Sequence, residues 1–465
     1  MATSKQHANK STLIIVSNRL PLSLRKVDNS FESSTSSGGL VTALSGLTDS
    51  MNFKWLGWPG ITAANDEEQE NAQRALGEKM AKGIFLEEQL AQDHYDGFSN
   101  TILWPTLHYQ SGIEFREEFW EAYRQVNEIF ADVVAEEAHT GDLIWIHDYH
   151  LMLLPSLLRS RLRAQGKECP IGFTLHTPFP ARDVWRGLPV EKELVTGMLA
   201  SDVVGFHTEE YKENFATACV NHSDVVGLEE TDCIRMGDHL AHLGVFIVGI
   251  DPIKFSETLK NPYVVNRINE LRHMHSNKTI MIGVDRLDYT KGLVQKLKGY
   301  ERFLNDNPEL RNKVVLVQVA VPSRENVKEY QDLEEEIQTL VGKICGEHCA
   351  PDNFPLVYMH RSISFTELTA LYSVAEVCLV TSQRDGMNLV ASEYIACQGH
   401  RHGVLVLSEF AGAASFMQEG SILFHPSSTD QLSQAIYQAV TMNQDERKKR
   451  YESLCDFVTN YTRCA

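Results

Sequence analysis

The stretch TIMIGVDRL, Thr279 to Leu287, joins an apolar run to an aspartate and an arginine. Short apolar runs rich in β-branched residues are typical of strands buried on both faces of a parallel sheet. Similar runs recur along the chain: LIIVS (13–17), DLIWIH (142–147), IGFTLH (171–176), VVGF (203–206), GVFIVGI (244–250), VVLVQVAVP (314–322), PLVYMH (355–360), VCLVTS (377–382) and GVLVLS (403–408). Segments of helical period, such as residues 151–166 and 326–344, lie between them. This alternation predicts an α/β fold with parallel sheets, in preference to an α+β fold with mixed sheets.

The length of the chain, 465 residues, predicts two domains. The division falls after GVFIVGI, which gives an N-terminal domain over residues 1–251, with 1–10 as a flexible tail, and a C-terminal domain over 252–465. Polar residues gather at the carboxyl ends of the runs: Asn18, Arg19, Asp148, His176, Arg286, Arg324, Arg384 and Asp385. Open α/β sheets bind ligands at that edge. We therefore predict two Rossmann-like domains whose parallel sheets face each other across a cleft.

Composition and charge limit the class of protein. The formal net charge of −19 argues against a nucleic-acid or anionic membrane partner, so phosphorylated ligands would need a local concentration of Arg and Lys. Nine cysteines lack metal-binding spacing and favour free thiols in a reducing compartment. No apolar signal precedes the first strand, and no run is long enough to span a bilayer. We expect a cytoplasmic protein.

Common catalytic motifs are missing from the sequence. It contains no dinucleotide GxGxxG, no Walker loop, no HExxH and no GxSxG elbow. Hydride transfer, P-loop nucleotide hydrolysis, zinc proteolysis and α/β-hydrolase chemistry therefore have no support from motifs.

Arg286 and Lys291, in GVDRLDYTKG (283–292), form the strongest local signal. The two cations follow a strand end five residues apart, where they can flank a diphosphate. The alternative is a pair of surface cations in a loop, and this stretch alone does not decide between the two.

A second signal is TSQRDGMNLVASEYIAC (381–397), where we expect a helix to begin near Met387. The amides at its start would suit a phosphate. Asp385, Leu389 and Glu393 are spaced i, i+4, i+8, which would place them on one helix face, where the carboxylates can accept hydrogen bonds from sugar hydroxyls. The alternative is that Asp385 caps the helix and Glu393 is solvated.

Two further strand ends carry polar side chains. Asp148 and His176 each follow an apolar strand, although a lone histidine is more often structural. Arg19 follows the first strand, and Gly38 and Gly39 open a helix after a Ser-rich stretch, again offering a cation and free amides to an anion. The alternative for the Ser-rich stretch is a plain flexible loop.

Together, these motifs resemble one family, the trehalose-6-phosphate synthases, from about Leu13 to about Tyr461. They stand in that family's order and spacing: SNRLP (17–21), GWPG (57–60), FSNTILWPTLHY (98–109), WIHDYHLMLLP (145–155), HTPFP (176–180), DRLDYTKG (285–292), VAVPSRE (319–325) and DGMNLVASEY (385–394). The resemblance implies a B-type glycosyltransferase fold. It also implies transfer of glucose from UDP-glucose to glucose 6-phosphate, giving α,α-trehalose 6-phosphate and UDP without cofactor or metal ion.

The resemblance also implies roles for individual residues. UDP-glucose would contact Gly38, Gly39, Arg286, Lys291, Ile363, Asp385, Gly386, Met387, Asn388, Leu389, Val390 and Glu393. Glucose 6-phosphate would contact Arg19, Trp58, Tyr95, Trp104, Asp148 and Arg324, with core packing as the alternative for both tryptophans. The catalytic residues would be Arg286, Lys291, His176 and Asp148.

The expected chemistry retains the configuration of the anomeric carbon. Double displacement would require a carboxylate nucleophile close to that carbon, and the family pattern supplies none. Front-face attack is therefore expected, with Arg286 and Lys291 in place of a metal ion.

Two departures and two alternatives accompany this interpretation. The segment between Leu20 and Gly38 is a long loop, as in fungal members. The chain stops at Ala465 without the family's Trp-containing crossover, so either the sequence is shortened or the domains dock more weakly than in relatives. The alternatives are a catalytically silent paralogue that senses sugar phosphates, and a related transferase with another acceptor. The sequence leaves open whether the chain forms a homo-oligomer and whether it forms a complex with a trehalose-phosphate phosphatase subunit.

Overall fold

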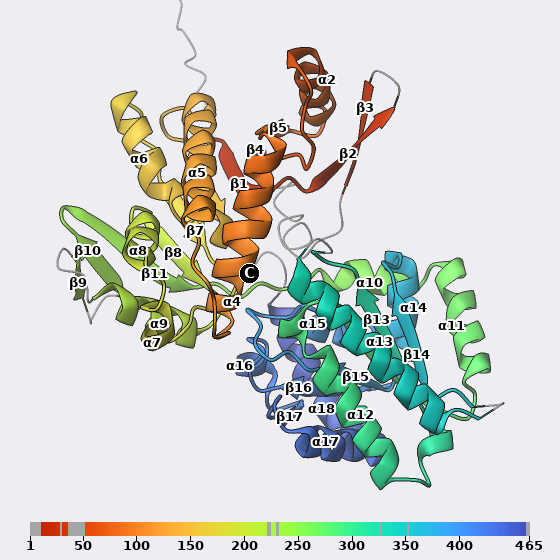
Figure 1. Ribbon diagram of the computed structural model, residues 1–465. Helices are drawn as coiled ribbons and strands as arrows, with labels where there is room; N and C mark the ends of the chain where they lie inside the picture. Colours follow the sequence, from red (N-terminus) through yellow and green to blue (C-terminus); the bar gives the residue numbers. More distant parts are fainter. Residues whose placement is uncertain are drawn as a thin grey trace, which may run out of the picture. The chain divides into compact units, whose positions relative to one another are not determined.

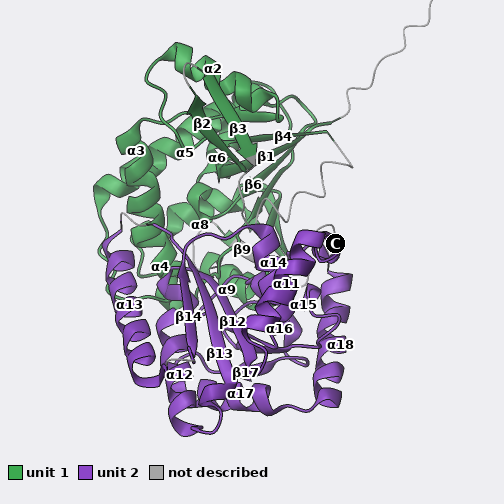
Figure 2. Ribbon diagram, turned by 90° about the vertical axis from the view of Figure 1, so that its right-hand side faces the viewer, with its two compact units in different colours: residues 1–246 green, residues 247–465 purple. Residues whose placement is uncertain are grey.

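The computed structural model describes residues 11–27, 30–35, 52–220, 225–228, 232–324, 327–350 and 353–461. The chain forms two compact units, residues 1–246 and 247–465 (Figure 2). The domain boundary expected at 251 and 252 falls shortly after this division. The tail expected over residues 1–10 lies outside the described residues.

The first unit is built on one large, mostly parallel sheet (Figure 1). Its strand order is β5-β4-β1-β6-β7-β8-β11-β10-β9, and β10 and β9 are antiparallel to their neighbours. The strands are β1 (Leu13–Arg19), β4 (Phe53–Trp58), β5 (Ala81–Gly83), β6 (Leu143–His147), β7 (Ile171–Thr174), β8 (Val203–Phe206), β9 (Val225–Leu228), β10 (Cys233–Met236) and β11 (His239–Val245), with a separate hairpin of β2 (Leu22–Val27) and β3 (Ser30–Thr35).

Helices connect these strands, as the βαβ pattern requires. They are α2 (Asp66–Gly77), α3 (Glu88–Gln92), the π-helix η2 (Asp93–Leu103), α4 (Trp104–Leu107), α5 (Glu117–Glu137), the 3₁₀ turn η3 (Tyr149–Leu151), α6 (Leu154–Ala164), α7 (Arg182–Trp185), α8 (Glu191–Leu199) and α9 (Glu209–Cys219).

The second unit contains a fully parallel sheet in the order β14-β13-β12-β15-β16-β17. Its strands are β12 (Thr279–Arg286), β13 (Val314–Val321), β14 (Leu356–His360), β15 (Val377–Val380), β16 (Val404–Ser408) and β17 (Ile422–Phe424). Its helices are α10 (Pro252–Thr258), α11 (Pro262–Met274), η4 (Tyr289–Lys291), α12 (Leu293–Asp306), η5 (Arg311–Lys313), α13 (Lys328–His348), α14 (Phe365–Val374), α15 (Val390–Ala396), α16 (Ala414–Met417), α17 (Thr429–Thr441) and α18 (Gln444–Asn460).

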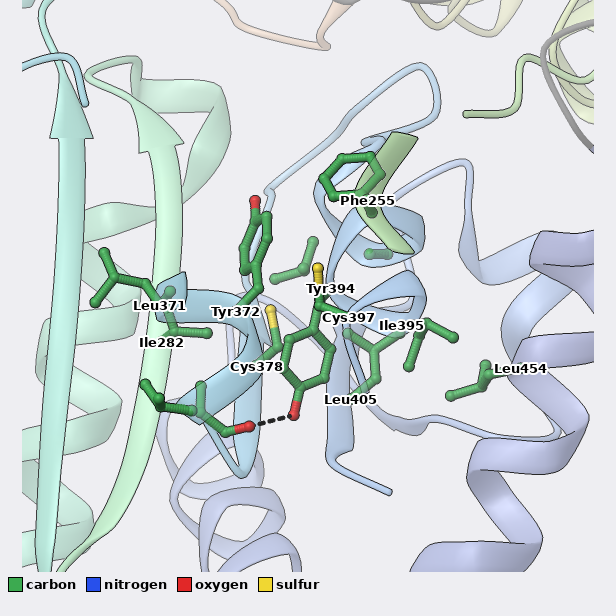
Figure 3. Packing of buried hydrophobic residues seen from close by; sticks show 14 of the residues in the cluster. Phe255, Ile282, Leu371, Tyr372, Cys378, Tyr394, Ile395, Cys397, Leu405 and Leu454 are labelled. Carbon is green, nitrogen blue, oxygen red and sulfur yellow. Dashed lines mark hydrogen bonds between the residues drawn. The ribbon is translucent and has the colours of Figure 1, made fainter. Parts of the chain in front are cut away.

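Both faces of the second sheet are buried. Along β12, Ile280 and Ile282 pack into one hydrophobic cluster, and Met281 between them packs into another. Figure 3 shows part of the first cluster, in which Ile282 and Tyr394 are among the labelled residues. This alternation explains why β12 is apolar over consecutive residues from Ile280 to Ile282, because side chains on both faces leave water.

The predicted strands are confirmed, with three corrections. The strand expected over residues 244–250 is wrong beyond Val245, because Phe206, the last residue of the neighbouring strand β8, pairs with Val245 and leaves no ladder partner beyond it. The first sheet is mixed, since the short strands β9 and β10 add an antiparallel edge. The loop expected after Leu20 contains the hairpin β2–β3.

Candidate active site

An ion pair joins two predicted donor residues in the second unit. Lys291 ends the turn η4 after β12, and Asp385 follows the neighbouring strand β15. Lys291 Nζ lies 2.5 Å from Asp385 Oδ2, which also accepts hydrogen bonds from Ser382 Oγ and Asn388 Nδ2, each at 3.0 Å. The parallel sheet thus brings together side chains that are far apart in the sequence.

Gly292 allows the close approach of these two strand ends. Its φ is +65°, and a Cβ at this position would lie 2.1 Å from the carbonyl oxygen of Thr381. Thr381 Oγ1 donates to the carbonyls of Lys291 and Gly292, both at 3.2 Å. Because any side chain here would push the two segments apart, glycine is required to place Lys291 beside Asp385.

Asp288 lies at the centre of a second cluster. Its carboxylate is fully buried. Oδ1 accepts from the backbone N–H of Thr290 at 3.0 Å and from Thr290 Oγ1 at 2.8 Å. Oδ2 lies 3.2 Å from Arg324 Nη1, 3.2 Å from the Tyr330 hydroxyl and 3.7 Å from Arg286 Nη2. One carboxylate therefore contacts both a predicted donor cation and a predicted acceptor cation.

The charges around Asp288 decide its protonation state. Burial by itself raises the pKa of this carboxyl. The nearby positive charges of Arg324, Arg286 and Lys291 outweigh burial and hold the pKa well below its usual range. Asp288 is therefore ionised at neutral pH. The sequence analysis missed this residue, although an acid between two cations in DRLDYTKG was the available signal.

Arg324 is held in an uncommon backbone conformation. Its φ is +51°, in the left-handed region, and its side chain is 3% exposed. Nη1 donates to the Tyr330 hydroxyl as well as to Asp288. Arg286, in contrast, has a side chain that is 44% exposed. The structure thus places the predicted donor and acceptor cations of this unit around one buried anion.

The segment around Asp385 differs from the expected helix. Helix α15 begins at Val390, not near Met387, and Asn388 has a φ of +71°. Asp385 instead forms an isolated parallel bridge to Ala411. The prediction of one helix face through Asp385, Leu389 and Glu393 is therefore wrong for Asp385, because pairing with the segment after β16 overrides the helical spacing.

Glu393 lies within α15 and is half-buried. It accepts a hydrogen bond from the Tyr372 hydroxyl at 3.1 Å. Burial raises the pKa of Glu393, and the hydrogen bond from Tyr372 offsets only part of this rise. The alternative of a solvated Glu393 is therefore wrong.

The remaining predicted donor residues lie near this segment or outside the described chain. Ile363, Leu389 and Val390 are partly buried against the hydrophobic cluster of Figure 3, and Met387 is buried within it. The carbonyl of Gly386 contacts Gly412 so closely that a Cβ on Gly412 would lie 2.0 Å from it. Gly38 and Gly39 fall outside the described residues.

In the first unit, three predicted acceptor residues converge. Arg19 ends β1 and is paired in register with Trp58 at the end of β4. The Arg19 guanidinium carbon lies 5.0 Å from the Trp58 ring centroid and 6.0 Å from the ring centroid of Tyr95, which lies in η2. Two aromatic rings thus flank an exposed cation at a carboxyl strand end.

Trp104 has a different environment from Trp58. It is buried at the start of α4, and its ring centroid lies 4.0 Å from that of His108 and 5.6 Å from that of Tyr149. Trp58 is only half-buried. The packing of Trp104 agrees with the core role that the sequence left as an alternative, and its contact with the acceptor stays a prediction.

Asp148 and His176 are neighbours at the ends of β6 and β7. The backbone N–H of His176 donates to Asp148 Oδ1 at 3.2 Å, and the N–H of Asp148 donates to the Thr174 carbonyl at 2.8 Å. Asp148 has a φ of +76°, a strained conformation for a non-glycine residue. The two predicted catalytic residues of this unit therefore share one strand edge.

His176 is the middle member of a chain of three histidines. His147 Nδ1 lies 2.9 Å from His176 Nε2, and His176 Nδ1 lies 3.1 Å from His207 Nε2. His207 Nδ1 lies 3.0 Å from the Phe246 carbonyl, which can only accept. His207 therefore carries its proton on Nδ1, and the same tautomer follows for the other two rings. Sequence reasoning missed His147 and His207.

Burial keeps His147 and His176 neutral. It lowers the pKa of His176 to about 4. The pKa of His147 is well below its usual value, because of burial and then the neighbouring His176 and His207. Both nitrogens of the neutral His176 ring therefore take part in the chain at pH 7, Nδ1 as donor and Nε2 as acceptor.

The described residues show neither a metal-binding cluster nor a membrane-spanning helix. That part of the chain contains no group of three or more His, Cys, Asp or Glu side chains arranged to hold a metal ion. Its helices include none with the length and apolar character needed to cross a membrane.

Known proteins resemble this chain over nearly its whole length. The model of glycosyltransferase family 20 matches residues 11–464. An Aspergillus niger protein named alpha,alpha-trehalose-phosphate synthase (UDP-forming) 2 is 49% identical over 454 residues, which cover 97% of this chain and 94% of that protein.

Solved structures agree with the fold. One, described as trehalose-6-phosphate from E. coli bound with UDP-2-fluoro glucose, is 30% identical with a TM-score of 0.86, over 97% of this chain and 96% of its own. An alpha,alpha-trehalose-phosphate synthase (UDP-forming) from Burkholderia xenovorans in complex with glucose-6-phosphate is 30% identical with a TM-score of 0.86, over 97% of each chain. The predicted pair of Rossmann-like domains is confirmed.

Proposed function

The chain belongs to glycosyltransferase family 20, and from this premise we propose that it transfers glucose from UDP-glucose to glucose 6-phosphate. The products are α,α-trehalose 6-phosphate and UDP. The observation that carries this proposal is the clustering of Arg286, Lys291 and Asp385 at the carboxyl edge of the second sheet. Such an edge is where open α/β sheets bind nucleotides.

On the donor side, Arg286 and Lys291 face the diphosphate. As the bond from the anomeric carbon to the UDP oxygen breaks, negative charge grows on the diphosphate, and two fixed cations stabilise it. The ion pair with Asp385 keeps Lys291 in place before the donor binds. Asp385, Glu393 and the backbone from Gly386 to Val390 bind sugar and ribose hydroxyls, and Ile363 contacts the nucleoside.

On the acceptor side, Arg19 and Arg324 bind the phosphate of glucose 6-phosphate. The aromatic faces of Trp58 and Tyr95 orient the Arg19 guanidinium. Asp148 accepts hydrogen bonds from acceptor hydroxyls, and Trp104 supports the wall of the site. His176, whose ring orientation is fixed by His147 and His207, contacts the donor sugar.

The reaction retains configuration at the anomeric carbon. The acceptor hydroxyl attacks from the face that UDP leaves, and the departing phosphate oxygen takes the hydroxyl proton. The protein contributes positioning and charge stabilisation rather than a covalent intermediate or a metal ion.

An assay of UDP release tests this proposal against its alternatives. Glucose 6-phosphate should support rapid release, whereas fructose 6-phosphate, glucose and buffer alone should support little. Equal rates with fructose 6-phosphate would favour a transferase with another acceptor, and no release with any acceptor would favour a silent sensor. The same assay in EDTA should lose no activity, and loss restored by magnesium would contradict the role of the two cations.

Two further expectations belong to this proposal. The free thiols favour a cytoplasmic location, which cell fractionation can test. A homo-oligomer, or a complex with a phosphatase subunit, would appear as a larger mass in analytical ultracentrifugation of the purified chain or of the mixture.

A further inference from the structure

We propose that Asp288 and Tyr330 are positioning residues that orient Arg324 toward the acceptor phosphate and connect it to the donor cation Arg286. This inference rests on the proposed function, since it assumes that Arg324 binds a phosphate. It concerns two side chains that have no expected contact with either substrate.

The two oxygens of the Asp288 carboxylate have separate tasks. Oδ1 accepts both hydrogen bonds from Thr290 and so fixes the turn that carries Lys291. Oδ2 faces Arg324 Nη1 at 3.2 Å and Arg286 Nη2 at 3.7 Å. Because Asp288 is fully buried and the Arg324 side chain is 3% exposed, water screens this pair little, and the carboxylate fixes the position of Arg324 Nη1.

Tyr330 completes the attachment of Arg324. Its hydroxyl oxygen accepts from Arg324 Nη1, and its O–H lies 3.2 Å from Asp288 Oδ2, to which it donates. Burial raises the pKa of Tyr330, so the hydroxyl retains the proton that this relay requires. A guanidinium is planar, and two contacts to the same Nη1 fix the direction of the whole fork.

The backbone of Arg324 also indicates an imposed orientation. A φ of +51° is unfavourable for arginine, and surrounding contacts must maintain it. Within the described residues, the contacts with Asp288 and Tyr330 anchor the side chain of Arg324, which is 3% exposed. Without them, the residue would relax toward an ordinary conformation and the guanidinium would move.

The experiment compares two acceptors in two variants. Asp288→Asn keeps the shape and the acceptor oxygen for Thr290 but removes the charge that holds Arg324. Tyr330→Phe removes only the relay hydroxyl. Tyr300→Phe is the matched control, because Tyr300 is also a buried tyrosine of this unit, and its hydroxyl donates to the Pro355 carbonyl at 2.7 Å, away from the cluster.

The readout is the ratio of kcat/KM for glucose 6-phosphate to kcat/KM for glucose. Asp288→Asn should lower this ratio by about ten- to hundredfold, because glucose has no phosphate for Arg324 to bind. Tyr330→Phe should lower it by a smaller factor, and Tyr300→Phe should leave it unchanged. A purely structural role would reduce both rates equally together with the melting temperature.

The possible failures are distinguishable. A wild-type enzyme without preference for glucose 6-phosphate would contradict the proposed acceptor site itself. A wild-type preference that Asp288→Asn and Tyr330→Phe both retain would overturn the positioning role. If Asp288→Asn does not fold, the Tyr330→Phe variant alone tests the positioning role. An unchanged ratio of kcat/KM for glucose 6-phosphate to kcat/KM for glucose in that variant overturns the inference.

Discussion

At the scale of single residues, the candidate site contains strained backbone. Asp148, Arg324 and Asn388 all have φ values in the left-handed region, which is rare for residues other than glycine. All three lie just after strands or beside predicted ligand contacts, and their side chains are held by hydrogen bonds or ion pairs. Strain of this kind persists only where the surrounding structure maintains it, and it is often found at functional sites.

The donor cations give the first prediction. Arg286→Ala and Lys291→Ala should each lower kcat by about 10²–10³ with a smaller change in donor KM, because the charge they stabilise grows in the transition state. Steady-state kinetics with varied UDP-glucose measures both parameters. Lys298→Ala is the control, since Lys298 is an exposed lysine of α12 paired with Glu336, and it should keep wild-type rates. A raised donor KM with unchanged kcat would show that the two cations contribute only to ground-state binding of the donor.

At the scale of elements, strand register assembles the histidine chain. His147 ends β6 and pairs with Thr174 of β7, which in turn pairs with Gly205 of β8. His147, His176 and His207 therefore arrive side by side at the ends of three adjacent strands. Neutral rings matter here, because a second proton on Nε2 of His176 or of His207 would place a donor opposite the Nδ1–H of the preceding ring.

This chain predicts a pH dependence of stability. The pKa of His176 is about 4 in the folded protein, below its ordinary value of 6.5. The unfolded chain takes up this proton near pH 6.5 and the folded chain does not, so the free energy of unfolding should fall between about pH 6.5 and 4 and then level off. Above pH 6.5 this contribution is fully present.

Urea unfolding at pH 7, 6 and 5 measures this slope. One proton corresponds to about 1.4 kcal/mol per pH unit, and His176→Gln should remove up to this amount from the wild-type slope. His139→Gln changes an exposed histidine and serves as the control. A wild-type slope in the His176→Gln variant would show that this ring does not stay neutral.

A buried ion pair in the second unit gives another prediction. Lys296 of α12 and Asp285 of β12 are both buried and in contact, and Gln318 Nε2 donates to the same Asp285 oxygen at 2.9 Å. Lys296→Met should lower the free energy of unfolding by about 3–5 kcal/mol, because it leaves a buried carboxylate without its cation. Adding Asp285→Asn should restore part of the loss in chemical denaturation. A double variant less stable than the single would contradict this explanation.

At the scale of the whole molecule, each unit contains its own sheet. The strands of the second unit pair only with one another in the described chain, and its two hydrophobic clusters draw only on residues after Phe246. The proposed donor residues from Arg286 to Glu393 therefore all lie in the second unit, whereas His176 belongs to the first. Units with separate cores are expected to unfold as separate cooperative transitions.

Calorimetry with UDP tests this organisation. Two transitions are expected, and UDP at about 100 times its Kd should raise the transition of the unit over residues 247–465 by roughly 5–10 °C. The other transition should move much less. Lys291→Ala should reduce the shift, whereas Lys298→Ala should not. Equal shifts of both transitions by UDP would show that the nucleotide is not bound by this unit alone.

The sequence by itself determined the architecture and the chemical types at the site. Buried parallel strands are apolar on both faces, so runs such as residues 279–287 are recognisable without a structure. The ordered motifs around Arg286, Lys291 and Asp385 likewise carried the family resemblance, because they are local in the chain.

Only the tertiary structure decided how these residues meet. The bridge from Asp385 to Ala411 overrode the helical spacing through Glu393, and β8 ended the strand expected beyond Val245. The central position of Asp288 depends on the approach of Arg324, which follows β13. Such contacts join segments separated along the chain, and their geometry depends on register, burial and backbone conformation, none of which a local pattern of residues encodes.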